Sequence, residues 1–297
     1  MKIQSLTAPI KSKIQRTAKI LLTTALITIP AKCGVDKFVK ESEVLLPNVE
    51  QVINRHIVEG LNIEKSVNCR GGITYSYDSV SLEKLSKLFQ KANIHKTYTF
   101  PIDTALHPYI PSTGQFGSIR PYGRAHLGID IYPRLYGRKP TQPVPVLSAT
   151  DGIVVSVKQS PVKDPDNLIA NNIKIMAPDG KIYTYDHLGR PEDYPNKQYT
   201  KLKTLGTIIR VGDTIGTVGK TGETQVWHLH LSVQDLKERT EQLQNPTWLK
   251  LFKKHGVYAT PCGQIDPLNN EKAKGIANYL NQYKIDKGEK VDYVSDL

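Results

Sequence analysis

Aromatic residues and cysteines are scarce in this 297-residue chain, in which Phe, Trp and Tyr make up 7% and cysteine occurs three times. Proteins that bind single-stranded nucleic acid stack bases on aromatic side chains, so this composition gives little support for such a surface. Long apolar runs are lacking too. The run Ile20–Ile29 is shorter than the ~20 residues that a membrane-spanning helix needs.

Two motifs that would point to other chemistry are also missing. The motif His-Glu-x-x-His, which places two zinc ligands on a helix, does not occur. The segment Gly219-Lys220-Thr221 is similar to the end of a phosphate-binding loop, but position 214 is threonine where that loop needs glycine. The interleaved glycines of Val211–Gly222 instead predict sharp turns between short strands.

Glycine and proline are plentiful, with 21 and 19 residues, which favours strands and turns over a helical bundle. The segments Ile153–Val157, Ile173–Met176 and Ile182–Tyr185 are predicted strands. Pro178-Asp179-Gly180 lies between the last two and predicts a hairpin. The proline-flanked strand within 143–149 is expected at a sheet edge.

Residues 1–33 predict an export signal, because six basic residues and no acids accompany the apolar run Ile20–Ile29. An uncleaved amphipathic helix is the alternative. Cys33 stands where a lipidated cysteine would anchor the chain to a membrane, although Lys32 before it differs from the usual small residue. We expect an exported protein of the periplasm or cell envelope, or a secreted one.

The charge and the remaining cysteines leave alternatives open. Without the six basic residues of the signal the formal charge falls from +12 to +6, which suits either nucleic acid or an anionic envelope polymer. Cys69 and Cys262 could form a disulfide in an oxidising compartment or remain two buried thiols.

The chain divides into regions that differ in expected secondary structure and in charge. Residues 34–96 form an N-terminal region of unknown role, in which Ser81–Ile94 reads as an amphipathic helix that packs on a core. Strands and turns dominate 97–268, with long loops at Lys158–Asn171 and Gly189–Leu205. The tail 269–297 is charged and predicts a surface helix.

Two histidines, His228 and His230, are separated by one apolar residue in Trp227-His228-Leu229-His230-Leu231. Alternate residues of a strand share a face, so both imidazoles would project together while the leucines face a core. The alternative is a chance pair on an exposed strand.

A second stretch, His126-Leu127-Gly128-Ile129-Asp130-Ile131, repeats the alternation and places His126 and Asp130 on one face. Gly128 lies between them, where a missing side chain would leave room for an ion or a substrate backbone. One carboxylate and two imidazoles suit Zn²⁺ with a fourth position open. A further histidine, His187, follows a strand and is either structural or an acid/base group beside the metal.

Together these residues resemble the lysostaphin/LytM-type zinc endopeptidases, which cut peptide cross-links of peptidoglycan. The resemblance covers residues 97–268 and rests on six motifs in the family's order. They are Phe116-Gly117-x-x-Arg120, His126-x-x-x-Asp130, Tyr185-x-His187-Leu188, the glycine run 211–222, His228-x-His230 and Asp266-Pro267.

The resemblance implies that His126, Asp130 and His230 bind one Zn²⁺ ion. It implies that His187 and His228 are catalytic, activating zinc-bound water and stabilising the oxyanion. The chemistry agrees, because zinc lowers the pKa of bound water to about 7 and a neutral imidazole can transfer its proton.

The implied fold is mainly β: an antiparallel-sheet LytM-type (duplicated hybrid motif) domain, with a small mixed α/β N-terminal region. The sheet would form the floor of a groove for peptidoglycan stem peptides, with the two long loops as walls. Residues 34–96 could block that groove. Val226-Trp227 and Leu231-Ser232 depart from the family's pattern around the paired histidines, which bears on specificity.

The alternative function is a non-catalytic LytM-like scaffold that activates another cell-wall hydrolase. Such scaffolds typically lose metal ligands, whereas this chain keeps all three ligands and both catalytic histidines. The sequence therefore favours the enzyme.

Overall fold

A computed structural model of the chain describes residues 63–69, 72–77, 79–95, 97–120, 124–160, 169–194, 201–235 and 263–288. All of them belong to the compact unit Val49–Leu297. The predicted export signal, Cys33 and Cys262 lie outside these residues. So do most of the predicted wall 158–171, the middle of the wall 189–205 and the segment 236–262. Within the described part, no helix combines the length and apolarity needed to cross a membrane.

Strands are the commonest regular elements among the described residues. The helices are α4 (Ser79–Lys91) and α7 (Glu271–Asp286). The strands are β1 (Ile63–Cys69), β2 (Gly72–Tyr77), β3 (Ile119–Arg120), β4 (Arg124–Ala125), β5 (Ile129–Ile131), β6 (Pro145–Leu147), β7 (Gly152–Lys158), β8 (Asn171–Met176), β9 (Ile182–Leu188), β10 (Ile208–Ile209), β11 (Thr214–Thr217), β12 (Leu229–Gln234) and β13 (Gln264–Ile265).

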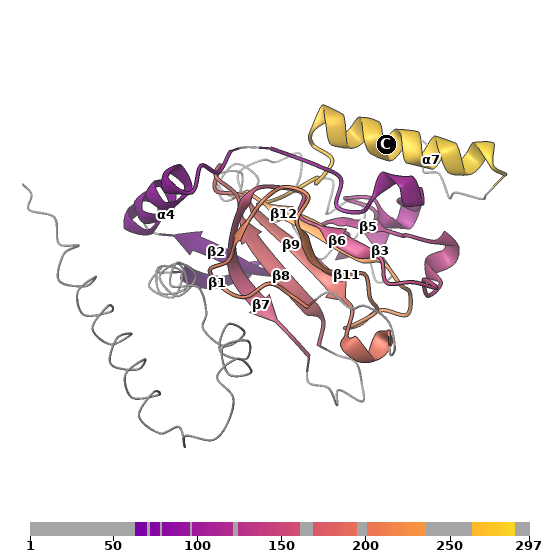
Figure 1. Cartoon of the computed structure of the whole chain (residues 1–297), viewed down its shortest axis with the longest axis horizontal. Helices are drawn as coiled ribbons and strands as arrows, with labels where there is room; N and C mark the ends of the chain where they lie inside the picture. The colour runs from indigo at the N-terminus through magenta and orange to yellow at the C-terminus, as the bar shows by residue number, and fades with distance from the viewer. Residues whose placement is uncertain are drawn as a thin grey trace, which may run out of the picture. The chain divides into compact units, whose positions relative to one another are not determined.

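One antiparallel sheet of seven strands organises the described residues (Figure 1). Its strand order is β10-β7-β8-β9-β12-β13, and β5 pairs with β12 beside this path. Three two-stranded sheets, β1-β2, β6-β11 and β3-β4, accompany it. The predicted mainly antiparallel β fold is confirmed, and the helix α4 with β1 and β2 agrees with the small α/β N-terminal region.

The predicted hairpin joins β8 and β9. Its turn is closed by the Gly180 N–H, which donates to the Ala177 carbonyl at 3.0 Å, and Gly180 has a φ of 83°. Only glycine adopts that backbone conformation without steric cost, so the Pro-Asp-Gly signal reports the turn directly. The proline-flanked strand β6 is an edge strand, as predicted, because its sheet has two strands.

The sheet has two different faces. One face packs into the main core through residues such as Ile131, Tyr185 and Leu231, each 0% exposed. On the other face the polar side chains lie at one end of strands β9 and β12. The opposite end of that face is apolar and packs against α4 through Ile153, Val155, Met176 and Ile182.

Helix α4 contributes the apolar stripe that the sequence predicts. Leu85, Leu88 and Phe89 are buried against the sheet, at the spacing of one helix face. Polar contacts fasten the end of the helix, since the Arg210 guanidinium donates to the carbonyls of Ala92 and Asn93. This part of the N-terminal region is therefore integral to the folded unit. Its predicted role as a block of the groove stays a prediction.

The C-terminal helix α7, yellow in Figure 1, confirms the helix predicted in the tail. Asn270 caps its N-terminus, accepting from the Lys272 N–H at 2.9 Å. Ala277 and Leu280 enter the main core, and Asn281 bonds the backbone of Ile110. The helix thus packs beside the segment around Ile110, which comes before β3 in the chain.

The buried Tyr185 hydroxyl offers a test of the core, because it accepts a hydrogen bond from the Ala149 N–H at 2.8 Å. Tyr185→Phe should lower the free energy of unfolding by about 1–3 kcal/mol, since a buried N–H loses its acceptor. Urea denaturation measures this value. Tyr279→Phe, at a side chain that is 63% exposed, is the control and should change it by less than about 0.5 kcal/mol. Equal free energies of unfolding for the two variants would contradict the role of the Tyr185 hydroxyl as the acceptor of the Ala149 N–H.

Candidate metal centre

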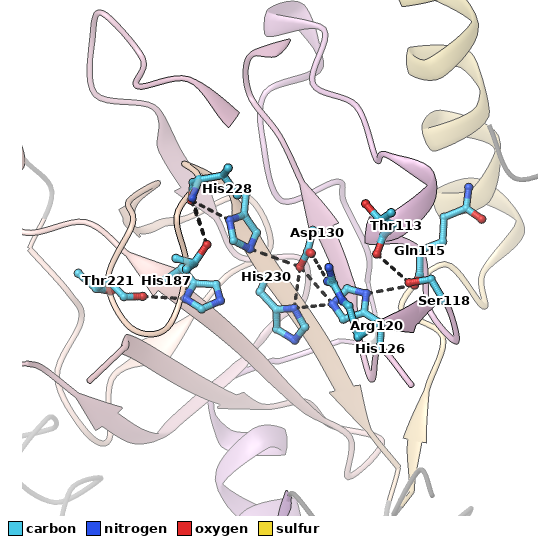
Figure 2. A network of polar contacts seen from close by, with 12 residues as sticks. Thr113, Gln115, Ser118, Arg120, His126, Asp130, His187, Thr221, His228 and His230 are labelled. Atoms are coloured by element: carbon cyan, nitrogen blue, oxygen red, sulfur yellow. Dashed lines mark hydrogen bonds and ion pairs between the residues drawn. The ribbon is translucent and has the colours of Figure 1, made fainter. Parts of the chain in front are cut away.

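The polar end of the sheet brings together three residues that could hold a metal ion: His126, Asp130 and His230. One candidate ligand atom from each lies within 4.8 Å of the others. Figure 2 shows them with His187 and His228 on the same side of the sheet. All five side chains that the sequence singles out therefore converge in space.

Strand register places two members of this trio opposite each other. In the β12–β5 pair, His230 faces Asp130, and Leu231 faces Ile129. Cross-strand partners project to the same side, so the histidine and the aspartate share the polar face while their apolar neighbours enter the core. The alternation predicted around His228 and His230 is confirmed, although β12 begins at Leu229 and His228 is joined to Gly219 by an isolated bridge.

His126 reaches the site by a different route from the one predicted. The sequence predicts one strand from His126 to Ile131, but β5 begins at Ile129. The His126 backbone bonds an earlier segment instead: its N–H donates to the Ser118 carbonyl at 2.9 Å, and its carbonyl accepts from Gly117 at 2.8 Å. These bonds keep His126 out of the β12 ladder and turn its ring toward Asp130.

Gly128 does not leave an open space, so the interpretation of this glycine as room for an ion or a substrate is wrong. A Cβ at this position would lie 2.5 Å from the Leu231 carbonyl oxygen and 2.7 Å from Nε2 of His230. The space is already filled by β12 and by the imidazole. Glycine is needed here so that the His230 ring can lie over the backbone.

Asp130 is the centre of the cluster, with a side chain only 4% exposed. Its Oδ1 lies 2.8 Å from Nδ1 of His230, 3.2 Å from Nε2 of His126 and 3.4 Å from Nε2 of His228. Its Oδ2 is bound by the Arg120 guanidinium. Burial alone would raise the pKa of Asp130, but the contacts with the three imidazoles outweigh it and lower the pKa far below its usual range.

A backbone contact sets the tautomer of His126, the first candidate ligand. Nδ1 of His126 donates to the Gln115 carbonyl at 3.1 Å, which leaves Nε2 with its lone pair toward Asp130. Burial, the largest influence, lowers the pKa of His126. A neutral imidazole is the form that binds a metal.

The His230 ring experiences opposite influences. Burial would lower its pKa, but the hydrogen bond and charge of Asp130, with a further contribution from Asp186, raise it overall. Its Nδ1 also lies 3.0 Å from Nε2 of His126. The two ring nitrogens and one carboxylate oxygen thus enclose a single small volume.

A β-bulge places His187 at the site. Asn171 pairs with Leu188 and Ile173 with Tyr185, so that Asp186 and His187 together oppose one residue of β8. His187 has a φ of 61°, a backbone conformation that is rare for residues other than glycine. Bulges redirect a side chain, and here the redirection carries the imidazole to the face of the metal candidate. His187 is thus at the end of β9, as predicted.

The two remaining imidazoles are held by backbone carbonyls. Nδ1 of His187 donates to Thr221 at 2.7 Å, and Nδ1 of His228 donates to Val226 at 3.0 Å. Their ring centroids are 4.7 Å apart. Burial, helped by the neighbouring histidines, lowers the pKa of His187 to about 3, so this ring is neutral at physiological pH with Nε2 available as a base.

The donor set fits zinc. Zinc binds imidazole nitrogen and carboxylate oxygen at about 2.0–2.2 Å, so tetrahedral ligand atoms lie roughly 3.3–3.5 Å apart. The observed separations of 2.8–3.2 Å among the three donor atoms need only a slight expansion to meet that value. Three protein ligands leave a fourth position open, which is the arrangement of catalytic zinc sites.

Sequence reasoning missed three contributors to the site. Gln115 and Thr221 act through their backbone carbonyls, which any residue type supplies, so no side-chain pattern could reveal them. Arg120 is part of a recognised motif, but nothing in the sequence connects its guanidinium to Asp130. A basic residue six positions before the first ligand is the signal that was available.

Comparison with known proteins confirms the resemblance that the motifs predict. Residues 124–246 match the model of peptidase family M23. The match includes the three candidate ligands and both further histidines. No curated protein matches the chain.

Solved structures of other proteins are similar to parts of the chain. A zinc-containing peptidase from Vibrio cholerae is 23% identical over 47% of this chain and 37% of its own, with a TM-score of 0.34. Lysostaphin from Staphylococcus simulans is 22% identical over 48% and 44%, with a TM-score of 0.26. The catalytic domain of the M23 protein EnpA from Enterococcus faecalis is 20% identical over 47% and 86%, with a TM-score of 0.31.

Metal analysis tests the site directly. We expect the purified chain to bind about one zinc ion, and Asp130→Ala to weaken that binding by at least about 100-fold, because it removes one of the three candidate ligands. Competition with a chromophoric chelator measures the affinity. His95→Ala, at an exposed histidine, is the control and should bind like the parent chain. Unchanged affinity in Asp130→Ala would contradict the assignment.

Proposed function

Since residues 124–246 match peptidase family M23, we propose that this chain is a zinc metalloendopeptidase that hydrolyses peptide cross-links of bacterial peptidoglycan. The observation that carries the proposal is the convergence of His126, Asp130 and His230 on one small volume, with His187 and His228 beside it. A structural zinc site would need four closed ligands, whereas this trio leaves one position open.

The proposed metal would have three protein ligands and would act as a Lewis acid. His126 would bind it through Nε2, His230 through Nδ1 and Asp130 through Oδ1, the atoms that already face one another. Zinc bound there supplies a Lewis acid that polarises a peptide carbonyl and acidifies water near neutral pH.

His187 and His228 would move the protons of the reaction. Each donates its Nδ1–H to a backbone carbonyl, which fixes the ring and leaves Nε2 to accept a proton. Peptide hydrolysis needs a base for the attacking water and an acid for the leaving amine. Two rings 4.7 Å apart can share these tasks, and a protonated ring would also stabilise the developing oxyanion.

The proposed substrate and location follow from the family and the charge. Without the six basic residues of the predicted signal the formal net charge is +6, which favours anionic polymers, and the cell envelope holds such polymers. The predicted export signal would bring the enzyme to that compartment. The proposed location is thus the periplasm or cell envelope, with secretion as the alternative.

Digestion of purified peptidoglycan sacculi tests the proposal. The parent chain should release soluble muropeptides, and mass spectrometry of the products identifies the bond that is cut. His228→Ala and His187→Ala should each lower the rate by about 10²–10⁴-fold, because proton transfer is lost. Both variants should keep most of the zinc, since neither residue is a proposed ligand.

His95→Ala is the matched control, because His95 is an exposed histidine that is not part of the site. It should digest sacculi at the parent rate. A chain that binds zinc but releases no muropeptides would overturn the proposed activity. A metal-free chain that stimulates a partner amidase would instead identify a scaffold.

A further inference from the structure

The two oxygens of Asp130 have different partners, and this difference carries a role for Arg120. Oδ1 faces the histidines, at 2.8 Å from Nδ1 of His230 and 3.2 Å from Nε2 of His126. Oδ2 is bound by a terminal nitrogen of the Arg120 guanidinium. Figure 2 shows the guanidinium on the side of the carboxylate where it meets this second oxygen.

The ion pair between Arg120 and Asp130 compensates a buried negative charge. The Asp130 side chain is 4% exposed, and a buried carboxylate is costly unless an opposite charge accompanies it. Arginine keeps its charge at every physiological pH, whereas the histidines around Oδ1 must be neutral to bind a metal. Arg120 is thus the partner that continues to compensate the carboxylate when the imidazoles are uncharged.

The backbone fixes the guanidinium relative to the ligands. Arg120 ends strand β3, which pairs with β4, and His126 directly follows β4. The His126 N–H donates to the Ser118 carbonyl at 2.9 Å, two residues before the arginine. The arginine and the first ligand therefore belong to one hydrogen-bonded unit, and the arginine side chain is 28% exposed, less than a free surface residue would be.

We propose that Arg120 is a positioning residue that occupies Oδ2 of Asp130 and so restricts this carboxylate to one-oxygen ligation of the metal. With Oδ2 engaged, Oδ1 is the oxygen that remains on the side of the imidazoles. Releasing Oδ2 would let the carboxylate rotate or bind through both oxygens, which changes the coordination number. Groups that hold a ligand in this way typically contribute 10–100-fold to metal affinity.

The inference rests on the metal centre of the proposed function but does not require peptide hydrolysis. The experiment compares the full parent chain, Arg120→Gln and Arg134→Gln by titration with Zn²⁺ against a chelator and by the visible spectrum with Co²⁺. Arg134 is exposed and serves as the control for loss of one positive charge. Thermal unfolding of each metal-free chain reports any general loss of stability.

We expect Arg120→Gln to bind Zn²⁺ about 10–100-fold more weakly than the parent, while Arg134→Gln binds like the parent. The Co²⁺ complex of Arg120→Gln should absorb more weakly in the visible range, as higher coordination numbers do. If Arg120→Gln does not fold, Arg120→Lys provides the same measurements, because it keeps the charge but replaces the planar guanidinium with a single ammonium group.

Parent-like zinc affinity and a parent-like cobalt spectrum in the Arg120 variant would overturn the inference. A variant that loses thermal stability without metal yet keeps the parent spectrum would also overturn it, because the ion pair would then be structural only. A parent chain that binds zinc without hydrolysing peptidoglycan would refute the proposed function alone. A parent chain that binds neither metal would refute both.

Discussion

The arrangement of the site depends on one buried carboxylate. Asp130 has a side chain 4% exposed and lies among three imidazoles and a guanidinium. These four groups come from three parts of the chain: β3, the segment after β4, and the His228–His230 run. A buried carboxylate is costly unless polar and charged partners accompany it, and these groups supply them.

Most of the site could be predicted because strand alternation relates side chains to faces. The spacing of His228 and His230 predicts a shared face for these two rings. His126 lies outside β5, so its place beside Asp130 and His230 follows from the motifs of the resemblance and not from alternation. The hairpin at Gly180 could be predicted for a similar reason, since its turn needs a conformation that glycine favours. Predictions succeeded where a local rule relates residue type to geometry.

The features of the site that the sequence did not predict depend on backbone contacts and on pairing between distant segments. The carbonyls of Gln115 and Thr221 orient two imidazoles, yet every residue has a carbonyl. The bulge at His187 arises from the mismatch of two strands, which a single segment does not reveal. Gly128 was misinterpreted because its neighbour is a ring on β12, about 100 residues away in sequence.

The placement of α4 has a consequence for how much of the sheet could support a bound chain. Along β12 the polar face runs from His230 through Ser232 to Gln234. Gln234 pairs with Ile182 of β9, which belongs to the apolar cluster formed with α4. Strands rise about 3.4 Å per residue, so the four residues from His230 to Gln234 span about 14 Å. An extended peptide aligned with β12 would therefore meet the helix after about four residues in that direction. Helix α4 therefore limits how far a bound ligand can extend past the histidines in this direction.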